Sequence, residues 1–268
     1  MLKPLYAPKG DKPMKVAGFM SGSGTNLIKI LEKQAALNQT SSGSPFEIRL
    51  IFTDNPESKA AEIAATYDVP FVVKDIMAFY RSLGRETKKD LTLRPEYDQQ
   101  VLDLIEPYGL DALVLAGYMS VVTQPLLKAF AGRIINVHPA DLRILTMGKR
   151  KYTGDYAVRD AILAGEKVIR SSTHIVRQEV DGGELLMVSA AVPVILPPGI
   201  SPEDLGAPES SARLNQIAGE HQDLLKEIGD WVILPKTLER LARGQYDLDR
   251  HGQVYFDGEP LGGDRLEI

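Results

Sequence analysis

Short apolar runs alternate with segments of helical periodicity along the first half of the chain. The runs predict strands at 16–20, 48–53, 71–73, 112–116 and 133–137. The segments between them predict helices at 27–37, 58–67, 95–108 and 125–129, the third with Val101, Leu102, Leu104 and Ile105 on its inner side. The alternation predicts an α/β fold with a doubly wound, mostly parallel, Rossmann-like sheet.

The pattern changes after residue 140. Helical spacing returns at 156–164, 210–228 and 236–242, whereas 172–177 and 185–194 are β-rich and are separated by a turn with two glycines. The tail at 246–249 and 253–256 predicts a hairpin. We therefore expect a lead-in at 1–13, one domain at 14–245 with a β-rich C-terminal half, and a hairpin and tail at 246–268.

Composition narrows the classes of function. The chain has 268 residues, 44% of them hydrophobic, and a net charge of −5 without a long basic run, which argues against nucleic acid as a partner. It has no cysteine, and its four histidines lack metal-ligand spacing, so we expect no metal site. No apolar stretch approaches the ~20 residues of a membrane helix. We expect a cytoplasmic monomer or homodimer that acts on small molecules.

The strand predicted at 133–137 leads into the most informative residues of the chain. Asn136 and His138 are two positions apart, so on a strand they point to the same side, and Pro139 ends the strand. Ligands bind at the carboxyl ends of the strands in open parallel sheets. A hydrogen-bond donor beside a titratable base at that edge indicates a catalytic site, although a lone histidine there is more often structural.

The first predicted strand is followed by a glycine-containing loop and a helix. Gly22, Ser23, Gly24, Thr25 and Asn26 form this loop, and the helix that follows offers free N–H groups to an anion. The loop lacks the lysine of a P-loop and the third glycine of a dinucleotide fingerprint. A phosphate monoester therefore fits better than NAD. Asp54, at the end of the second strand, keeps a ribose-binding NAD site open as an alternative.

Asp181 is the best candidate to complete a site with Asn136 and His138. A carboxylate close to an imidazole favours its charged form, so we expect Asp181 to raise the pKa of His138. An aspartate before two glycines also commonly caps its own turn, and sequence spacing does not separate these two interpretations.

Four segments together resemble the folate-dependent formyltransferases, most closely the glycinamide ribonucleotide formyltransferase branch of purine synthesis. They are Ser21 to Asn26, Val114 to Met119, Ile135 to Pro139, and Ser172 to His174 followed by Val180 to Gly183. They occur in the order of the family, and the resemblance covers roughly residues 14 to 245. It implies transfer of a formyl group from 10-formyltetrahydrofolate, as co-substrate, to the primary amine of a phosphorylated acceptor.

The resemblance also implies a role for each matching residue. Asn136 and protonated His138 would stabilise the oxyanion, with Asp181 holding the histidine charged. The loop 22–26 would bind the acceptor phosphate and Glu220 the acceptor ribose. The implied folate-binding residues are Arg94, Met119, Ser120, Val121, Val122 and Asn136.

Three segments depart from the family pattern. The stretch 140–154 is longer and more basic, Ser120 stands where the family has a basic residue, and residues 226–230 form an insertion in a late helix. Two alternatives therefore stay open: a formyltransferase that acts on another amine, such as a nucleotide-linked amino sugar, and a non-catalytic or NAD-type Rossmann binder.

Overall fold

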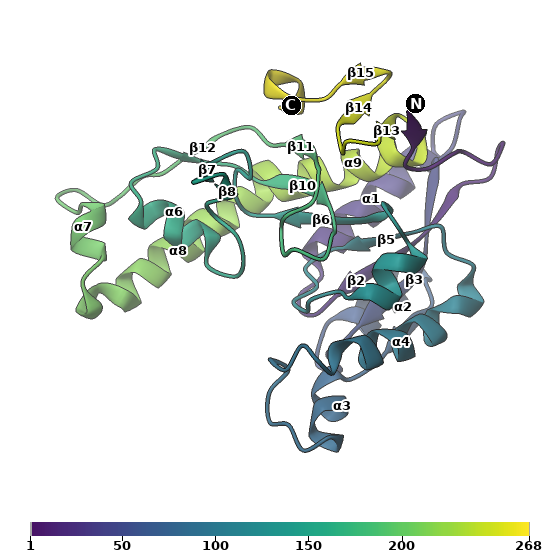
Figure 1. The fold of residues 1–268 in the computed structure, drawn as a ribbon, viewed down its shortest axis with the longest axis horizontal. Helices are drawn as coiled ribbons and strands as arrows, with labels where there is room; N and C mark the ends of the chain where they lie inside the picture. The colour runs from purple at the N-terminus through teal and green to yellow at the C-terminus, as the bar shows by residue number, and fades with distance from the viewer. Residues whose placement is uncertain (1, 268) are drawn as a thin grey trace.

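The central element of the computed structural model, which describes residues 2–267, is a seven-stranded sheet (Figure 1). Its strand order is β11-β10-β6-β5-β2-β3-β4. The bounds are β2 Met14–Met20, β3 Phe46–Thr53, β4 Phe71–Val73, β5 Ala112–Leu115, β6 Ile134–His138, β10 Ser172–Ile175 and β11 Leu185–Val188. The five strands β2 to β6 are parallel, and β10 and β11 add an antiparallel edge. The predicted α/β class with a mostly parallel sheet is confirmed.

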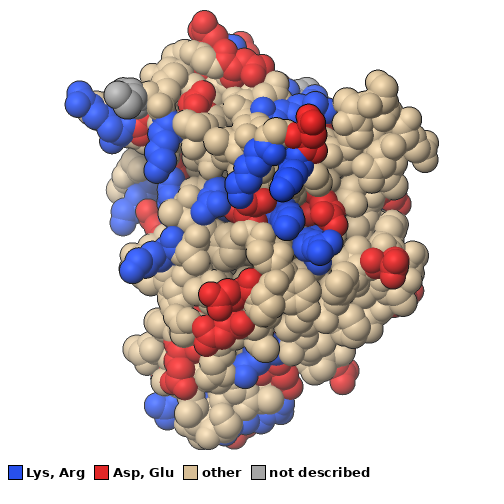
Figure 2. Space-filling model, turned by 90° about the vertical axis from the view of Figure 1, so that its right-hand side faces the viewer, with Lys and Arg blue, Asp and Glu red and all other residues tan. Residues whose placement is uncertain are grey.

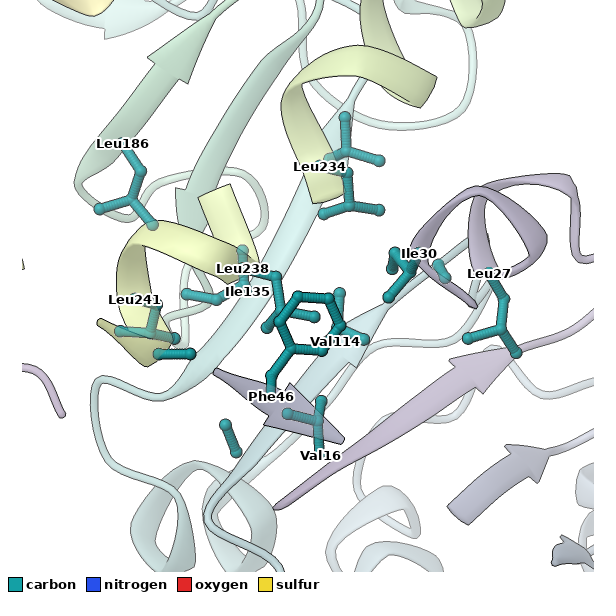
Figure 3. Packing of buried hydrophobic residues seen from close by; sticks show 14 of the residues in the cluster. Val16, Leu27, Ile30, Phe46, Val114, Ile135, Leu186, Leu234, Leu238 and Leu241 are labelled. Carbon is teal, nitrogen blue, oxygen red and sulfur yellow. The ribbon is translucent and has the colours of Figure 1, made fainter. Parts of the chain in front are cut away.

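Alternating side chains of the central strands form two cores, one on each face of the sheet. Val16, Val114 and Ile135 face one core, where they pack with helices α1 and α9 (Figure 3). Phe19 and Leu115 face the other core, which helix α4 covers. This follows from the two-residue period of a strand, and burial on both faces explains why these strands are apolar throughout.

In the first half of the chain, helices at 25–38, 60–67, 94–105 and 124–129 lie close to their predicted positions, whereas the helix at 76–82 was not predicted. The bounds are α1 Thr25–Asn38, α2 Ala60–Tyr67, α3 Ile76–Ser82, α4 Arg94–Ile105, α5 Gln124–Ala129, α6 Ala157–Leu163, α7 Pro202–Leu205, α8 Ser211–Leu225 and α9 Trp231–Ala242, with 3₁₀ turns at Glu106–Tyr108, Pro208–Ser210 and Gly263–Leu266. One detail of α4 is wrong in the prediction: Leu104 is 41% exposed, whereas Val101 and Ile105 are buried. At helical spacing, Leu104 falls outside the narrow stripe that meets the sheet.

The late helices form one continuous rod, where the sequence predicts a break between 228 and 236. A π-helical segment, Lys226–Asp230, joins α8 to α9 and coincides with the insertion noted in the sequence (Figure 1). Gly229 and Pro235 would weaken an isolated helix. Here burial of Leu234 and Leu238 in the main core stabilises the helix through both positions.

The remaining strands are short. They are β1 Lys3–Pro4, β7 Leu145–Thr146, β8 Lys149–Arg150, β9 Val168–Ile169, β12 Val192–Pro193, β13 Tyr246–Leu248, β14 Val254–Phe256 and β15 Glu259–Pro260. The predicted strand 185–194 is divided, because its end leaves the central sheet and pairs with β9. The predicted tail hairpin is present as β13 and β14, and it also pairs with β1, so the lead-in is tied to the tail.

Two further observations concern the surface and the helices. Figure 2 shows Lys and Arg side chains interspersed with Asp and Glu on one face of the molecule. Within residues 2–267, the chain has no helix that is both long enough and apolar enough to cross a membrane.

Candidate active site

A cleft of about 530 Å³ opens at the carboxyl ends of strands β2, β5 and β6. Its walls come from the loop after β2, the loop after β5, the end of β6, and the turn before β11. Most of the predicted site residues line it: Gly22, Ser23, Gly24, Thr25, Asn26, Met119, Ser120, Val121, Val122, Asn136, His138 and Asp181. Arg94 and Glu220 are the predicted residues that lie outside it. The location agrees with the rule for open parallel sheets.

The loop between β2 and α1 has the geometry of an anion site. Gly24 adopts a left-handed conformation (φ 69°), and a Cβ added there would lie 2.4 Å from Ile63 Cδ1, so only glycine fits. A Cβ at Gly22 would meet no atom within 4 Å, which leaves the loop open to a ligand. The N-terminus of the 14-residue helix α1 points its free N–H groups toward this space.

Two side chains extend the anion site across the cleft. The buried Oδ1 of Asn26 has no hydrogen-bond partner among the described residues, and Asn26 Nδ2 lies 3.5 Å from Asp230 Oδ2. Lys226, from the π-helical segment, lines the cleft and brings a positive charge. Together with the helix N-terminus, these groups can bind a phosphate and the polar part of the molecule that carries it.

Strand pairing brings a second histidine beside Asn136. In the antiparallel pair of β6 and β10, His174 lies directly opposite Asn136, and Asn136 Nδ2 is 3.3 Å from His174 Nε2. His174 Nδ1 donates to the carbonyl of Ile175 at 2.9 Å, so its Nε2 faces the site. This histidine belongs to the motif Ser172 to His174, but no local pattern in the sequence assigns it to the site. Only the register of the two strands reveals its place.

Asp181 joins the two histidines. Its Oδ2 lies 3.4 Å from His138 Nδ1, and its Oδ1 lies 3.4 Å from His174 Nε2. Its Oδ2 also accepts a hydrogen bond from the N–H of Gly154 at 2.9 Å. The carboxylate therefore bridges three groups of the site. It does not act as a simple cap of its own turn.

The protonation of this cluster differs from the expectation. Burial lowers the pKa of His138 from 6.5; Asp181 opposes the shift, while the nearby His174 and Arg150 add to it. Asp181 does raise the pKa of His138, as expected, but the loss of solvation outweighs this attraction and the net shift is downward. Burial also disfavours charge on Asp181, but the hydrogen bond from His174, the charge of His138 and the Gly154 N–H lower its pKa to about 2. Asp181 is therefore ionised at neutral pH, and His138 Nε2–H donates to the carbonyl of Tyr152 at 3.0 Å.

The loop Met119 to Val122 is held by a polar network. Asp54 is 1% exposed and accepts hydrogen bonds from the hydroxyls of Ser21 and Ser120. Lys88 donates to the carbonyl of Met119 at 2.8 Å and to Ser120 Oγ at 2.9 Å. A distant lysine thus brings a positive charge to the loop where Ser120 replaces the basic residue of the family. Both carboxylate oxygens of Asp54 already accept a hydrogen bond within the protein, which argues against its binding the ribose of NAD.

Arg94 lies behind this loop instead of in the cleft. It is 1% exposed and donates to the carbonyls of Val121 (3.4 Å) and Lys88 (3.1 Å). The expected direct contact with folate therefore has no counterpart in this geometry. Arg94 is the first residue of α4 and lies on its buried face, so its side chain turns into the core and supports the loop. The motif alone does not reveal this orientation.

Glu220 also lies away from the cleft. It is exposed on α8, where it accepts a hydrogen bond from Gln216 at 3.0 Å. Asp230, two to three helical turns later, is the carboxylate of the late helices that lines the cleft. Burial raises its pKa to about 6, against hydrogen bonds from Ser171 and Asn26 and the charge of Lys226. A local motif does not reveal which carboxylate of the late helices faces the cleft.

Comparison with known proteins gives a consistent result. The family model described as formyl transferase matches residues 14–207. The phosphoribosylglycinamide formyltransferase of Haemophilus influenzae is 28% identical over 248 residues, which are 92% of this chain and 95% of that protein. The enzyme of the same name from Escherichia coli is 28% identical over 194 residues, covering 72% of this chain and 79% of that protein.

A solved structure is similar over the same range. The crystal structure of glycinamide ribonucleotide transformylase 1 from Symbiobacterium toebii has a TM-score of 0.64 at 27% sequence identity. The match covers 92% of this chain and 95% of that chain.

Proposed function

The chain belongs to the formyl transferase family, and from that premise we propose that it transfers the formyl group of 10-formyltetrahydrofolate to the primary amine of glycinamide ribonucleotide, a step of purine biosynthesis. The observation that carries the proposal is the convergence of Asn136, His138 and Asp181 in one cleft with a phosphate-type anion site. A phosphate bound at residues 22–26 would hold the amine of the acceptor near the formyl carbon, which makes the reaction effectively intramolecular.

Asn136 and His138 would act on the formyl group. Attack of the amine places negative charge on the formyl oxygen, and the side-chain amide of Asn136 can donate a hydrogen bond to it. The attacking amine loses one proton and the leaving N10 gains one, and the pair of His138 and Asp181 would carry this proton from one nitrogen to the other. His138 Nδ1 faces Asp181, so a proton held between them is stabilised by the carboxylate.

The substrates would lie on opposite sides of this cluster. The backbone of Met119 to Val122, held by Lys88 and Arg94, would face the folate. Gly22 to Asn26 and Lys226 would bind the acceptor phosphate, and Asp230 its ribose hydroxyls. Each substrate thus has its own wall of the cleft, and the reacting atoms meet between Asn136 and His138.

The test is a two-substrate assay that follows loss of the folate donor. Turnover should require both 10-formyltetrahydrofolate and glycinamide ribonucleotide. His138→Ala should lower kcat by roughly 10²–10⁴-fold and Asn136→Ala by roughly 10²–10³-fold, the usual range for an acid–base group and an oxyanion donor. His251→Ala, at an exposed position in the tail, is the matched control. Near-normal turnover in His138→Ala and Asp181→Asn would refute the mechanism.

Transfer to a different amine is a second candidate function. It is favoured because segments that depart from the family pattern line the acceptor side of the cleft. Gly154 ends the long 140–154 stretch and Asp155 follows it, while Lys226 and Asp230 belong to the π-helical segment. All four residues line the cleft. The assay should therefore include a panel of phosphorylated amines and a nucleotide-linked amino sugar. Faster donor loss with one of these would reassign the acceptor. Tight binding in a titration with NADH would favour the dinucleotide alternative instead.

We also propose the setting in which the enzyme works. Its substrates are small molecules, and the similarity to enzymes of purine biosynthesis supports a cytoplasmic location. The net charge of −5 without a long basic run argues against nucleic acid as a partner. We assign the formyltransferase domain to 14–245 and the tail to 246–268, and we expect a monomer or homodimer. Light scattering after size-exclusion chromatography tests the oligomeric state.

A further inference from the structure

The hairpin of β7 and β8 is formed by the stretch that departs from the family pattern. Its two-residue turn, Met147 (φ 50°) and Gly148 (φ 76°), has positive φ at both positions, the conformation that matches the twist of a tight hairpin. Met147 at the tip is 97% exposed. The tip of the hairpin is therefore not packed in the core, and the contacts of the hairpin lie at its other end.

The last residue of the hairpin, Arg150, contacts the turn that carries Asp181. One Nη of Arg150 donates to the carbonyl of Asp181, and the other donates to the carbonyl of Gly183 at 2.6 Å. The planar guanidinium can bond two acceptors in a fixed geometry, which a lysine ammonium cannot reproduce. Arg150 is half-buried, does not line the cleft, and has both nitrogens engaged, so a role in binding substrate is excluded by this geometry.

The two carbonyls flank the turn that carries the carboxylate. Asp181 is in the left-handed region (φ 53°), which is unfavourable for a residue with a Cβ. Gly183 packs against β10 so closely that a Cβ would lie 1.7 Å from the carbonyl oxygen of Ile175. The backbone of this turn is therefore fixed at two points. One is the close packing of Gly183 against β10, and the other is the hydrogen bond from Arg150 to the carbonyl of Asp181.

We propose that Arg150 is a positioning residue that fixes the Asp181 turn and thereby aims the carboxylate at His138 and His174. The inference rests on the proposed function of this site. Arg150 acts through the peptide carbonyls of Asp181 and Gly183, and the carboxylate then holds its 3.4 Å distance to each histidine. The insertion in the 140–154 stretch thus adds a support for the catalytic carboxylate.

Three variants test the proposal kinetically. Arg150→Ala should lower kcat by roughly 10- to 100-fold, as expected for a displaced catalytic group, with the KM of each substrate changed by less than about threefold. Arg150→Lys should recover only part of this loss, and added guanidinium should partly rescue Arg150→Ala. Lys149→Ala, at the exposed neighbouring position of the same strand, should behave as the wild type.

A double-mutant cycle separates action through Asp181 from a general effect. In the Asp181→Asn background, Arg150→Ala should cause a further loss of less than about threefold, because the group that it positions is already disabled. Equal losses in both backgrounds, or near-normal kcat in Arg150→Ala, would overturn the inference. If the wild type itself transfers no formyl group, the proposed function fails instead.

Hydrogen exchange tests whether Arg150 fixes the Asp181 turn, without any measurement of activity. Amides in the segment 179–184 should exchange at least about tenfold faster in Arg150→Ala than in Lys149→Ala, because the turn loses two hydrogen bonds. Unchanged exchange in that segment would overturn the inference whatever the reaction turns out to be.

Discussion

Asp230 is a buried carboxylate whose charge should destabilise the folded protein. Burial raises its pKa from 3.8 to about 6. A pKa difference of about 2.2 between the folded and unfolded states, at about 1.36 kcal/mol per pKa unit, corresponds to about 3 kcal/mol. Asp230→Asn removes this titration while keeping an acceptor for the hydroxyl of Ser171.

The sign of the pH dependence follows from which state holds the proton. Below the unfolded pKa of 3.8, both states are protonated and Asp230 costs nothing. Between pH 3.8 and about 6, the unfolded state releases its proton while the folded state keeps it, so the free energy of unfolding falls as pH rises. Above pH 6 both states are ionised and the cost is complete. Asp230→Asn should therefore gain about 3 kcal/mol over the wild type between pH 4 and pH 8.

Urea unfolding at pH 4, 5, 6, 7 and 8 measures this difference directly. The comparison of the two proteins at each pH cancels the titration of all other groups. Asp103→Asn, an exposed carboxylate on α4, is the control and should show no pH-dependent difference. A difference that changes by less than about 1 kcal/mol across this range, or that decreases with pH, would refute the argument from burial.

Further predictions concern a histidine, a glycine and a lysine. The imidazole of His138 should titrate below pH 6.5 when followed by NMR, and a midpoint above 7 would contradict its loss of solvation. Gly183→Ala should cost at least about 3 kcal/mol in the free energy of unfolding because its Cβ meets a carbonyl, whereas Gly22→Ala should fold normally. Lys88→Met should raise the KM for the folate donor about tenfold at similar kcat, because the loop loses a hydrogen bond from a charged group. Lys89→Met, at an exposed position, is the control. An unchanged KM in Lys88→Met would rule out the role of Lys88 in holding the loop.

Only part of the site could be predicted from the sequence. Asn136 and His138 could be placed together from the sequence, because a strand has a fixed two-residue period and both positions lie on one strand. His174 and Asp230 could not. His174 reaches Asn136 through the register of β6 and β10, and Asp230 lines the cleft from the π-helical segment that joins α8 to α9.

Local pattern by itself determined the parallel sheet, the glycine loop before α1 and the edge at which the cleft opens, since each depends on neighbours along the chain. Tertiary structure alone decided that Arg94 turns inward, that Glu220 faces solvent, and that burial lowers the pKa of His138. The physical reason is that burial and long-range register depend on segments far apart in sequence. The charge of a group depends on the solvent it loses as well as on the partners it gains.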